Sequence, residues 1–463
     1  MMSTMDRVDH FGRDLFVALD RGDARPLRTQ LEEQLREGVR SGRLHAGTAL
    51  PSTRALAAEL GVARGVVVEA YGQLVAEGFL VAQRGSATRV ARVSAAQPLI
   101  KAPSTRMPPV RFDLRAESAD RAAFPRRAWL AAARRALAAA PDADLGYGRW
   151  AGAPALRAAL ASYLGRARGV VAEPEQVVIA SGITQAITLL AAVLGRRGAR
   201  TIIVEDPGFE HHRTGLERAG LALAPVPVDG AGLQTAALPA AAAALVTPAH
   251  QMPTGAVMAP ERRAALLDWA AAHDALVFED DYDGEYRYDR EPIGALQGLG
   301  PARVAYLGST SKTLAPALRL GWMVLPGDLA PELAEERGWS DGGSPVLDQL
   351  ALADLIERGE LDRHLRRMRL RYRRRRDALL AALARHLPDL EVGGAAAGLH
   401  VTLALAPGAD PDAIVDAAAA RGVGLFGVPH AQRPLLLVGY ANIADAAIDR
   451  GVAELAKAVR ESQ

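Results

Sequence analysis

The first ninety residues of the chain combine helical hydrophobic spacing with polar turns. Leucine and valine recur every four residues from Leu27 to Val39, which draws an apolar stripe along one face of a helix. Ser52 can N-cap a short second helix that Gly61 ends, and a third four-residue spacing follows directly. The pattern predicts helices over 26–43, 52–60 and 62–77 and a hairpin with strands over 79–82 and 87–90. Tightly joined helices followed by a hairpin are typical of a winged helix-turn-helix, which places one helix in the major groove of DNA.

Beyond residue 112 the pattern changes to short apolar runs separated by helical stretches, which is typical of an α/β sheet with parallel character. A helix-rich part and a final αβ part complete the chain. Strands are predicted over 177–180, 201–205, 244–247, 275–280 and 304–307, and a long arginine-rich helix over 344–387. The apolar residues of that helix recur at helical spacing, which favours a solvated or interface helix over a nucleic-acid patch.

The two patterns are separated by residues 93–110, which contain four prolines together with serine, alanine and glutamine. This composition continues neither pattern and predicts a linker. A length of 463 residues also exceeds what one hydrophobic core usually organises. We therefore predict a multi-domain chain: a small, mainly α winged helix-turn-helix with a β wing over 14–92, the linker over 93–110, and a large α/β domain over 111–463.

Composition and charge narrow the classes of function. Hydrophobic residues make up 49% and charged residues 23% of the chain, as in globular proteins with a substantial core. There is no cysteine, which excludes disulfides, thiolate metal sites and a thiol nucleophile, and no metal site is predicted. The first thirty residues lack the apolar stretch of a signal peptide or membrane span, so we expect a cytoplasmic protein with no membrane partner. Residues 25–92 hold ten arginines against six glutamates, an excess that suits a polyanion.

Several short motifs follow one another in the N-terminal segment. They read SGRL at 41–44, LPSTRALA at 50–57, LGV at 60–62, EGFL at 77–80 and RGS at 84–86. In this order they resemble the GntR-type winged helix-turn-helix. The resemblance implies binding of a double-stranded DNA operator, with DNA contacts from Ser52, Arg54, Arg64, Arg84 and Gly85.

The recognition helix departs from that family at one place. Residues 63–66 carry no hydroxyl group beside Arg64, whereas GntR proteins usually have threonine or a similar residue there. We therefore expect a different affinity or sequence preference. The alternative interpretation, in which the arginines merely solvate a small helical domain, leaves the helix order and the glycine at the wing tip unexplained.

The large domain places one lysine in a small, hydroxyl-rich loop directly after a predicted strand. The loop reads STSKTLAPALRLG over 309–321. Lys312 in it can form a Schiff base with an aldehyde, and the hydroxyls together with Arg319 can hold a phosphate. Another strand ends in FEDDYD at 278–283, where period-two alternation places Asp280 and Tyr282 on one side. A carboxylate there can keep a pyridine nitrogen protonated, and a phenol can bond to the ring oxygen.

Three further motifs suit the same ligand. SGITQ at 181–185 follows a strand and opens a helix, so its backbone amides can cradle a phosphate. DPGF at 206–209 offers Phe209 for stacking on an aromatic ring, and TPAHQMPTG at 247–255 offers His250 or Gln251 to the ring oxygen. The lysine loop or the acidic strand end alone would be more simply interpreted as solvated surface, and the combination of all five motifs favours a binding site.

In order and spacing, these five motifs resemble those of the fold-type I aminotransferases, from about residue 111 to the C-terminus. The resemblance implies pyridoxal 5'-phosphate as cofactor, Lys312 as the lysine that forms the Schiff base, and a homodimer with sites at the interface. It also implies a set of cofactor contacts: Ile183, Thr184, Ser309 and Arg319 to the phosphate, Phe209 stacking on the ring, Asp280 to the ring nitrogen, Tyr282 and Gln251 to the ring oxygen, and Tyr147 to the phosphate from the partner subunit.

A GntR-like domain before an aminotransferase-like domain resembles the MocR/GabR-type regulators. That resemblance implies a transcription regulator that senses pyridoxal phosphate or an amino compound through an aldimine at Lys312 and alters its operator binding, in control of vitamin B6 or amino acid metabolism. Residues 435–440 lack the arginine with which aminotransferases clamp a substrate carboxylate, and Arg433 is the nearest substitute. His211 stands where γ-aminobutyrate-sensing members carry arginine. Arg433 and His211 are therefore the candidate effector contacts.

Two other functions remain open at this point. A working pyridoxal-phosphate-dependent aminotransferase is one, because all its catalytic parts are present, and turnover of amino donors with 2-oxoglutarate would distinguish it. A DNA-binding scaffold that has lost its cofactor is the other, and it is disfavoured because Lys312, Asp280, Tyr282 and Arg319 all remain.

Overall fold

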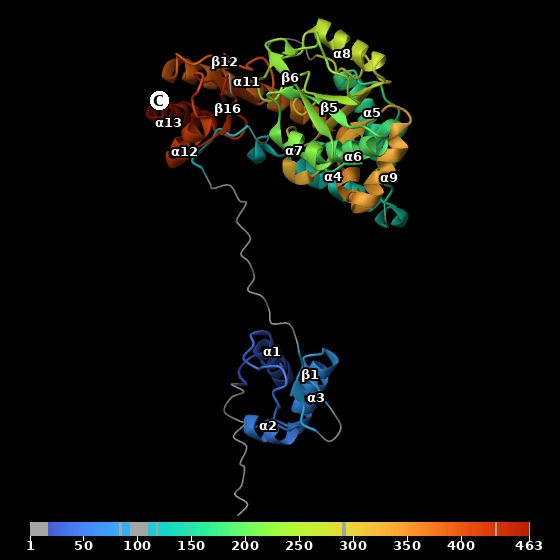
Figure 1. The fold of residues 1–463 in the computed structure, drawn as a ribbon, viewed down its shortest axis with the longest axis vertical. Helices are drawn as coiled ribbons and strands as arrows, with labels where there is room; N and C mark the ends of the chain where they lie inside the picture. Colours follow the sequence, from blue (N-terminus) through green and yellow to red (C-terminus); the bar gives the residue numbers. More distant parts are fainter. Residues whose placement is uncertain are drawn as a thin grey trace, which may run out of the picture. The chain divides into compact units, whose positions relative to one another are not determined.

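The chain divides into two compact units, Met1–Met107 and Pro108–Gln463 (Figure 1). The computed structural model describes residues 17–82, 86–92, 110–116, 119–146, 148–288, 293–430 and 433–462. Most of the linker over 93–110 therefore lies outside the described residues, and each unit is considered by itself.

The first unit has the predicted order of helices and strands. Ser52 N-caps the second helix, because its hydroxyl accepts a hydrogen bond from the amide of Ala55 at 3.2 Å. Gly61 ends that helix in the left-handed region with a φ of 62°. Leucines of all three helices, among them Leu31, Leu56 and Leu74, form one buried core. The elements are α1 (Leu27–Arg40), α2 (Thr53–Leu60), α3 (Arg64–Ala76), β1 (Leu80–Val81) and β2 (Arg89–Val90), with β1 and β2 antiparallel.

The second unit is built on an eight-stranded mixed sheet with the order β4-β11-β10-β9-β8-β5-β6-β7. Strands β10, β9, β8, β5 and β6 run parallel, while β11 is antiparallel to both of its neighbours and β7 is antiparallel to β6. The five strands expected from the sequence are all present, and β6, β7 and β11 were not expected. Their bounds are β4 (Val177–Ala180), β5 (Thr201–Asp206), β6 (Ala222–Asp229), β7 (Gly232–Leu233), β8 (Ala243–Val246), β9 (Leu276–Asp280), β10 (Val304–Ser309) and β11 (Gly321–Val324).

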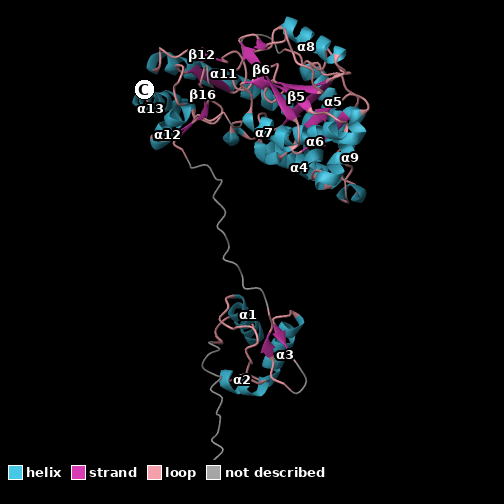
Figure 2. Ribbon diagram, viewed as in Figure 1, coloured by secondary structure: helices cyan, strands magenta, loops and turns pink. Residues whose placement is uncertain are grey.

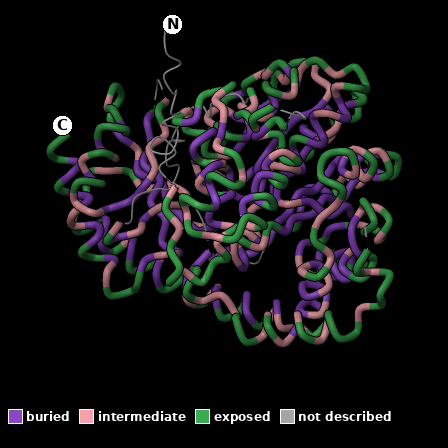
Figure 3. Tube along the Cα trace, turned by 90° about the horizontal axis from the view of Figure 1, so that it is seen from below, coloured by how far each residue is buried: buried purple, intermediate pink, exposed green. Residues whose placement is uncertain are grey.

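Helices cover both faces of this sheet (Figure 2). Alternate residues of β4 belong to different hydrophobic clusters, Val177 and Ile179 on one face and Val178 and Ala180 on the other. Both faces of the sheet are therefore buried at this strand. Along the helices, buried and exposed positions alternate (Figure 3). The helices are α4 (Arg126–Ala139), α5 (Pro154–Arg168), α6 (Ile183–Arg196), α7 (Glu210–Arg218), α8 (Pro260–Ala272), α9 (Leu329–Asp341), α10 (Val346–Glu357) and α11 (Glu360–His386).

The single long helix predicted over 344–387 was wrong, because α10 and α11 are separate helices. The helical conformation is interrupted at Gly359, which has a φ of 66° and precedes the first residue of α11. Only glycine enters this left-handed region without steric cost, so the residue ends one helix and redirects the next.

The C-terminal part of the second unit carries a smaller sheet with the order β12-β13-β16-β15. The segment that follows the linker joins this part: β3 pairs in parallel with β14, and the amide of Gly439 donates to the carbonyl oxygen of Leu114 at 2.7 Å. The elements are β3 (Phe112–Asp113), β12 (Val392–Gly393), β13 (His400–Ala404), α12 (Pro411–Ala420), β14 (Val423–Gly424), β15 (Phe426–Val428), β16 (Leu435–Gly439) and α13 (Ile448–Glu461).

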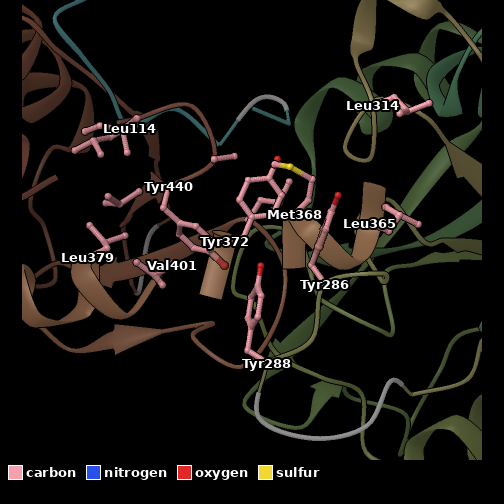
Figure 4. Close-up of a cluster of buried hydrophobic side chains, with 14 of the residues drawn as sticks. Leu114, Tyr286, Tyr288, Leu314, Leu365, Met368, Tyr372, Leu379, Val401 and Tyr440 are labelled. Atoms are coloured by element: carbon pink, nitrogen blue, oxygen red, sulfur yellow. The ribbon is translucent and has the colours of Figure 1, made fainter. Parts of the chain in front are cut away.

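A cluster of tyrosines joins the C-terminal part to the rest of the unit (Figure 4). The rings of Tyr286 and Tyr372 meet edge to face with 5.0 Å between centroids. The hydroxyls of Tyr288 and Tyr440 both donate to the carbonyl oxygen of Gly398, at 2.8 and 2.6 Å. Buried phenols with partners fix the loop around Gly398, which lies next to the site described below.

Within the described part of the chain, no helix is both long and apolar enough to cross a membrane.

Candidate cofactor site

A cavity of about 570 Å³ opens where β4, β5, β9 and β10 end. The carboxyl ends of parallel strands are where α/β sheets place their ligands. Residues of β15 and β16 close the cavity from the C-terminal part of the unit. Eight residues expected from the sequence line it together: Ile183, Thr184, Phe209, Asp280, Tyr282, Ser309, Lys312 and Arg319.

Lys312 lies in the turn that follows β10. Its Nζ donates a hydrogen bond to the carbonyl oxygen of Ala116 at 3.3 Å, and Ala116 also lines the cavity. An amine in a cavity wall can form a covalent bond to an aldehyde. The position of Lys312 therefore suits a cofactor that carries a carbonyl group.

Asp280 provides a buried carboxyl group in the same cavity. It is 5% exposed, and its Oδ1 has no hydrogen-bond partner among the described residues. Burial, and next the nearby Asp281, raise the pKa of Asp280 well above its usual range. Nδ1 of His212 lies 3.5 Å from Oδ2, and burial lowers the pKa of His212 to about 3, so this imidazole is neutral. Such a lone carboxylate is suited to a protonated ring nitrogen.

Of the three other acidic residues of the FEDDYD motif, Glu279 and Asp281 point away from the cavity, as period-two alternation predicts. The carboxylate of Glu279 accepts from the amides of Leu296 and Gln297 at 2.7 and 2.9 Å. Asp281 forms a buried, two-pronged pair with Arg168 at 2.7 and 3.0 Å. These contacts fix the backbone from which Asp280 and Tyr282 project.

The start of α6 and Arg319 form an anion cradle. Gly182 precedes α6 with a φ of 123°, and a Cβ placed there would lie 3.4 Å from a guanidinium nitrogen of Arg319. Unpaired amides at a helix N-terminus and an arginine fork both favour a phosphate. Thr184 and Ser309 also line the cavity. The site thus fits pyridoxal phosphate at three independent points: the aldehyde, the ring nitrogen and the phosphate.

Phe209 forms part of the cavity wall and is 43% exposed. Its ring meets that of His212 edge to face at 4.7 Å between centroids. One face of the phenyl ring is therefore open to a planar ligand.

Gln251 does not line the cavity, contrary to the expectation for a ring-oxygen contact. Its side-chain amide donates to Oε2 of Glu205 at 3.1 Å and to the carbonyl oxygen of Pro207 at 2.9 Å. Burial raises the pKa of Glu205 to about 7, and the amide is used to satisfy this buried acid. The neighbouring Met252 reaches the cavity instead.

Neither candidate effector residue lines the cofactor cavity. Arg433 forms an ion pair with Glu391 and lines a separate cavity of about 530 Å³. The ring of His211 lies 6.2 Å from that of Phe209 but does not line the cofactor cavity, whereas Arg213 lines it and pairs with Asp206 at 3.1 Å. Tyr147 lies outside the described residues.

Several lining residues were not expected from the sequence. His212 follows Phe209 by three positions, a spacing that places both on one helix face and could have identified it. Others come from β15, β16 and the loop between them, which no motif marks, among them Phe426, Val428, His430 and Leu437.

In the first unit, the arginines expected to contact DNA are exposed. Arg54 lies in α2 and Arg64 begins α3, and both side chains face solvent. Nε of Arg64 donates to the hydroxyl of Thr53 at 3.3 Å, which links the starts of the two helices. Ser52 uses its hydroxyl as the cap of α2. Arg84 and Gly85 lie outside the described residues.

The fold and the cavity together define a class: an aminotransferase-like domain of the pyridoxal-phosphate type preceded by a helix-turn-helix unit. Residues 117–452 match the family model "Aminotransferase class I and II", and residues 27–90 match "Bacterial regulatory proteins, gntR family". An archaeal alanine:glyoxylate aminotransferase has a similar structure, with a TM-score of 0.71 and 25% identity over 90% of this chain and 97% of that chain.

Relatives that cover nearly the whole chain are named as regulators. The probable rhizopine catabolism regulatory protein MocR of Rhizobium meliloti is 34% identical, over 96% of this chain and 95% of its own. The pyridoxine biosynthesis transcriptional regulator PdxR of Corynebacterium glutamicum is 36% identical, over 90% and 91%. The chain belongs to this family of MocR-type, helix-turn-helix transcriptional regulators, and pyridoxal phosphate is the cofactor of its aminotransferase-like domain.

Proposed function

We propose that this regulator senses pyridoxal phosphate or an amino compound at Lys312 and that occupancy of the cavity changes its affinity for operator DNA. The observation that carries the proposal is the convergence of Lys312 with the unpartnered Oδ1 of Asp280 and the anion cradle at Gly182. Occupancy can alter DNA binding only if the ligand prefers one of two conformations. Control of vitamin B6 or amino acid metabolism is the proposed role, and the name of the PdxR relative supports the former.

The residues of the cavity have distinct proposed roles. Bound pyridoxal phosphate supplies an aldehyde and an electron-withdrawing ring. Lys312 holds the aldehyde carbon, Asp280 the ring nitrogen and Tyr282 the ring oxygen. The amides of Ile183 and Thr184, with Ser309 and Arg319, hold the phosphate, and Phe209 packs on the ring.

The nature of the cavity wall favours pyridoxal phosphate itself, or an amine without a carboxylate, over an amino acid. Leu437 of β16 lines the cavity, and Arg433 is paired with Glu391 in the other cavity. Arg213 is paired with Asp206, and Arg319 faces the anion cradle. In the described part of the chain, therefore, each arginine of the cavity already has an anionic partner or a proposed one.

A route from the cavity toward the DNA-binding unit begins at Lys312. Its amine donates to the carbonyl oxygen of Ala116, in the segment 110–116 that follows the linker. This hydrogen bond and the covalent bond to the cofactor require the same nitrogen. Loading of Lys312 therefore changes the contacts of the first residues after the linker.

We also propose that the chain forms a homodimer in the cytoplasm, where its operator lies. Several large apolar side chains of the second unit are exposed, among them Leu130 and Leu137 on α4, Trp339 on α9, and Trp150, whose ring lies 6.3 Å from that of Trp339. Patches of this kind usually mark an interface. Light scattering of Trp339→Asp should report a monomer if this surface forms the dimer, and an unchanged dimer would place the interface elsewhere.

The central experiment measures binding of the purified chain to DNA upstream of its own gene, with and without pyridoxal phosphate, at fixed physiological salt. Specific binding that changes with the cofactor, and that no longer changes in Lys312→Ala, is the expected result. Arg64→Ala, in the recognition helix, should weaken binding in both conditions because its site is independent of the cavity. Binding that ignores the cofactor would contradict sensing of pyridoxal phosphate.

A second candidate function is transamination, because Lys312, Asp280 and Tyr282 line one cavity as a working site requires. Turnover of amino donors with 2-oxoglutarate tests it directly. Rapid turnover without specific DNA binding would mean that the chain acts as an enzyme and does not sense a ligand to control DNA binding.

A further inference from the structure

A chain of polar side chains runs from the wall of the cofactor cavity into the protein interior. The hydroxyl oxygen of Tyr282, which lines the cavity, lies 2.9 Å from Nδ1 of His250. The same nitrogen lies 3.1 Å from Oδ2 of Asp283. His250 and Asp283 are each 1% exposed. The phenol is thus connected through one imidazole nitrogen to a buried carboxyl group.

Nδ1 of His250 has two hydrogen-bond partners, and at any time it either donates a hydrogen bond or accepts one. A neutral imidazole nitrogen carries either a hydrogen or a lone pair. A carboxylate only accepts, so Asp283 favours the tautomer with the hydrogen on Nδ1. Nε2 of His250 then carries the lone pair. It has no hydrogen-bond partner among the described residues, and a buried unpaired acceptor is tolerated better than a buried unpaired N–H.

The tautomer determines where Tyr282 can donate. With a hydrogen on Nδ1, the imidazole cannot accept the phenolic hydrogen, and the remaining direction for that hydrogen is the cavity. Burial, and next the nearby Asp283, raise the pKa of Tyr282 well above its usual range, so the phenol keeps its hydrogen. Tyr282 therefore presents a donor to whatever occupies the cavity.

The surroundings hold His250 and Asp283 in place. A Cβ on Gly398, which has a φ of 74°, would collide with the His250 ring, so the backbone packs directly on this pair. The ring of His400 lies 4.9 Å from that of His250, and burial lowers the pKa of His400 to about 3, which keeps it neutral. The other ionisable groups that act on the chain of side chains are Asp280, Glu205, Lys312 and Tyr440.

We propose that His250 is a positioning residue: held by Asp283, it directs the hydroxyl hydrogen of Tyr282 to the ring oxygen of the cofactor and so sets the pH at which the lysine-bound cofactor changes colour. The inference rests on the proposed attachment of pyridoxal phosphate to Lys312. A donor at the ring oxygen withdraws electron density and lowers the proton affinity of the nearby lysine nitrogen. Loss of the donor should therefore raise the midpoint of the colour change.

The test is a pH titration of the visible absorbance of the full-length protein loaded with pyridoxal phosphate. Tyr282→Phe should raise the midpoint by about one pH unit, since a hydrogen bond to a charged group is worth roughly that much. His250→Leu should raise it in the same direction, and His250→Asn, whose amide can replace the Nδ1 donor, should retain most of the original value. The double variant should shift no further than Tyr282→Phe alone, because both changes remove one interaction.

Matched variants keep the result interpretable. His386→Asn alters a histidine that pairs with a carboxylate at the surface, at 3.2 Å from Asp449, and should leave the midpoint unchanged. If His250→Leu does not fold, Asp283→Asn carries the same test and should also raise the midpoint. Shifts that add in the double variant, or an unchanged midpoint in the variants of His250 and Asp283, would overturn the proposal.

Two other outcomes of these measurements can be distinguished from a failure of the proposed role of His250. The ligand atoms of His250, Asp283 and His400 lie within 4.8 Å of one another, as around a metal ion. If the purified protein contains stoichiometric metal and His400→Leu does not, these three residues form a metal site and the proposed hydrogen-bonded chain is wrong. A wild-type protein that shows no lysine-bound colour would instead refute the attachment at Lys312, and with it the proposed function.

Discussion

Replacement of Asp280 by asparagine should have opposite effects on the cofactor-free and the cofactor-loaded protein. Without cofactor, Asp280 is a buried carboxyl group whose Oδ1 has no partner among the described residues. Its pKa is raised well above the ordinary 3.8, so the folded state loses stability as the pH rises from 3.8 through the raised value. Asparagine removes this ionisation and its cost.

The expected magnitudes follow from the contacts. The neutral amide of asparagine avoids the cost of a buried ionisable group, which we set at about 1–3 kcal/mol, so Asp280→Asn should raise the free energy of unfolding of the cofactor-free protein by up to that amount near neutral pH. With cofactor, the variant loses a charge-assisted hydrogen bond worth roughly 1.5–3 kcal/mol. That loss corresponds to cofactor binding weakened by about ten- to a hundredfold.

Glu279→Gln is the matched control, because Glu279 belongs to the same strand and is equally buried. Both of its carboxylate oxygens accept from backbone amides, so its replacement should destabilise the fold and leave cofactor affinity unchanged. All five tryptophans of the chain lie in the second unit, and their fluorescence during urea unfolding reports on that unit alone. Titration with pyridoxal phosphate gives the affinity. If Asp280→Asn destabilises the cofactor-free protein as Glu279→Gln does and binds the cofactor as tightly as the wild type, Asp280 does not contact the cofactor.

Three further predictions concern the fold around the site. Arg168→Met leaves the buried Asp281 without its cation and with the hydroxyl of Tyr306 as its remaining side-chain donor; it should lower the free energy of unfolding by about 3–5 kcal/mol in urea denaturation, whereas an unchanged value would mean that the pair is not formed. Gly359→Ala forces a side chain into the left-handed region between α10 and α11 and should cost about 1–2 kcal/mol, measured in the same way. Because the pKa of His212 falls from 6.5 to about 3 on folding, the unfolded chain binds a proton in that window and stability declines as the pH falls through it. His212→Gln should flatten this part of the stability profile, and a profile identical to that of the wild type would show that His212 is protonated in the fold.

The strands and the site motifs were predictable where local pattern determines structure. Alternation was sufficient to place Asp280 and Tyr282 on one side, although β9 ends at Asp280 and Tyr282 lies two residues beyond it. The unexpected strand β6 contains Pro225 and Pro227, which argue against a strand. It tolerates them because β7 pairs only with Val228 and Asp229, so the outer edge at the prolines needs no amide donor.

The residues that sequence could not place lie in irregular segments. Around Gln251 the chain turns, so alternation gives no direction, and the outcome depends on Glu205, which is 46 residues away and must be satisfied by the glutamine amide. Arg433 was chosen for its position near β16, but its partner Glu391 lies in a different part of the chain. Contacts between distant segments of this kind depend on tertiary packing, which no local motif records.

The proposed influence of the cavity on DNA binding depends on distant segments in the same way. Its floor is formed by the ends of the central strands, and its other wall by β15 and β16 of the C-terminal part. The segment 110–116 is attached to that C-terminal part, through β14 and Gly439, and to Lys312 through Ala116. A ligand that draws the two walls together, or that takes the amine of Lys312 from Ala116, must therefore alter the contacts of the residues that lead from the linker. Because such coupling is reciprocal, a factor by which pyridoxal phosphate changes operator affinity is also the factor by which operator DNA changes the affinity for pyridoxal phosphate.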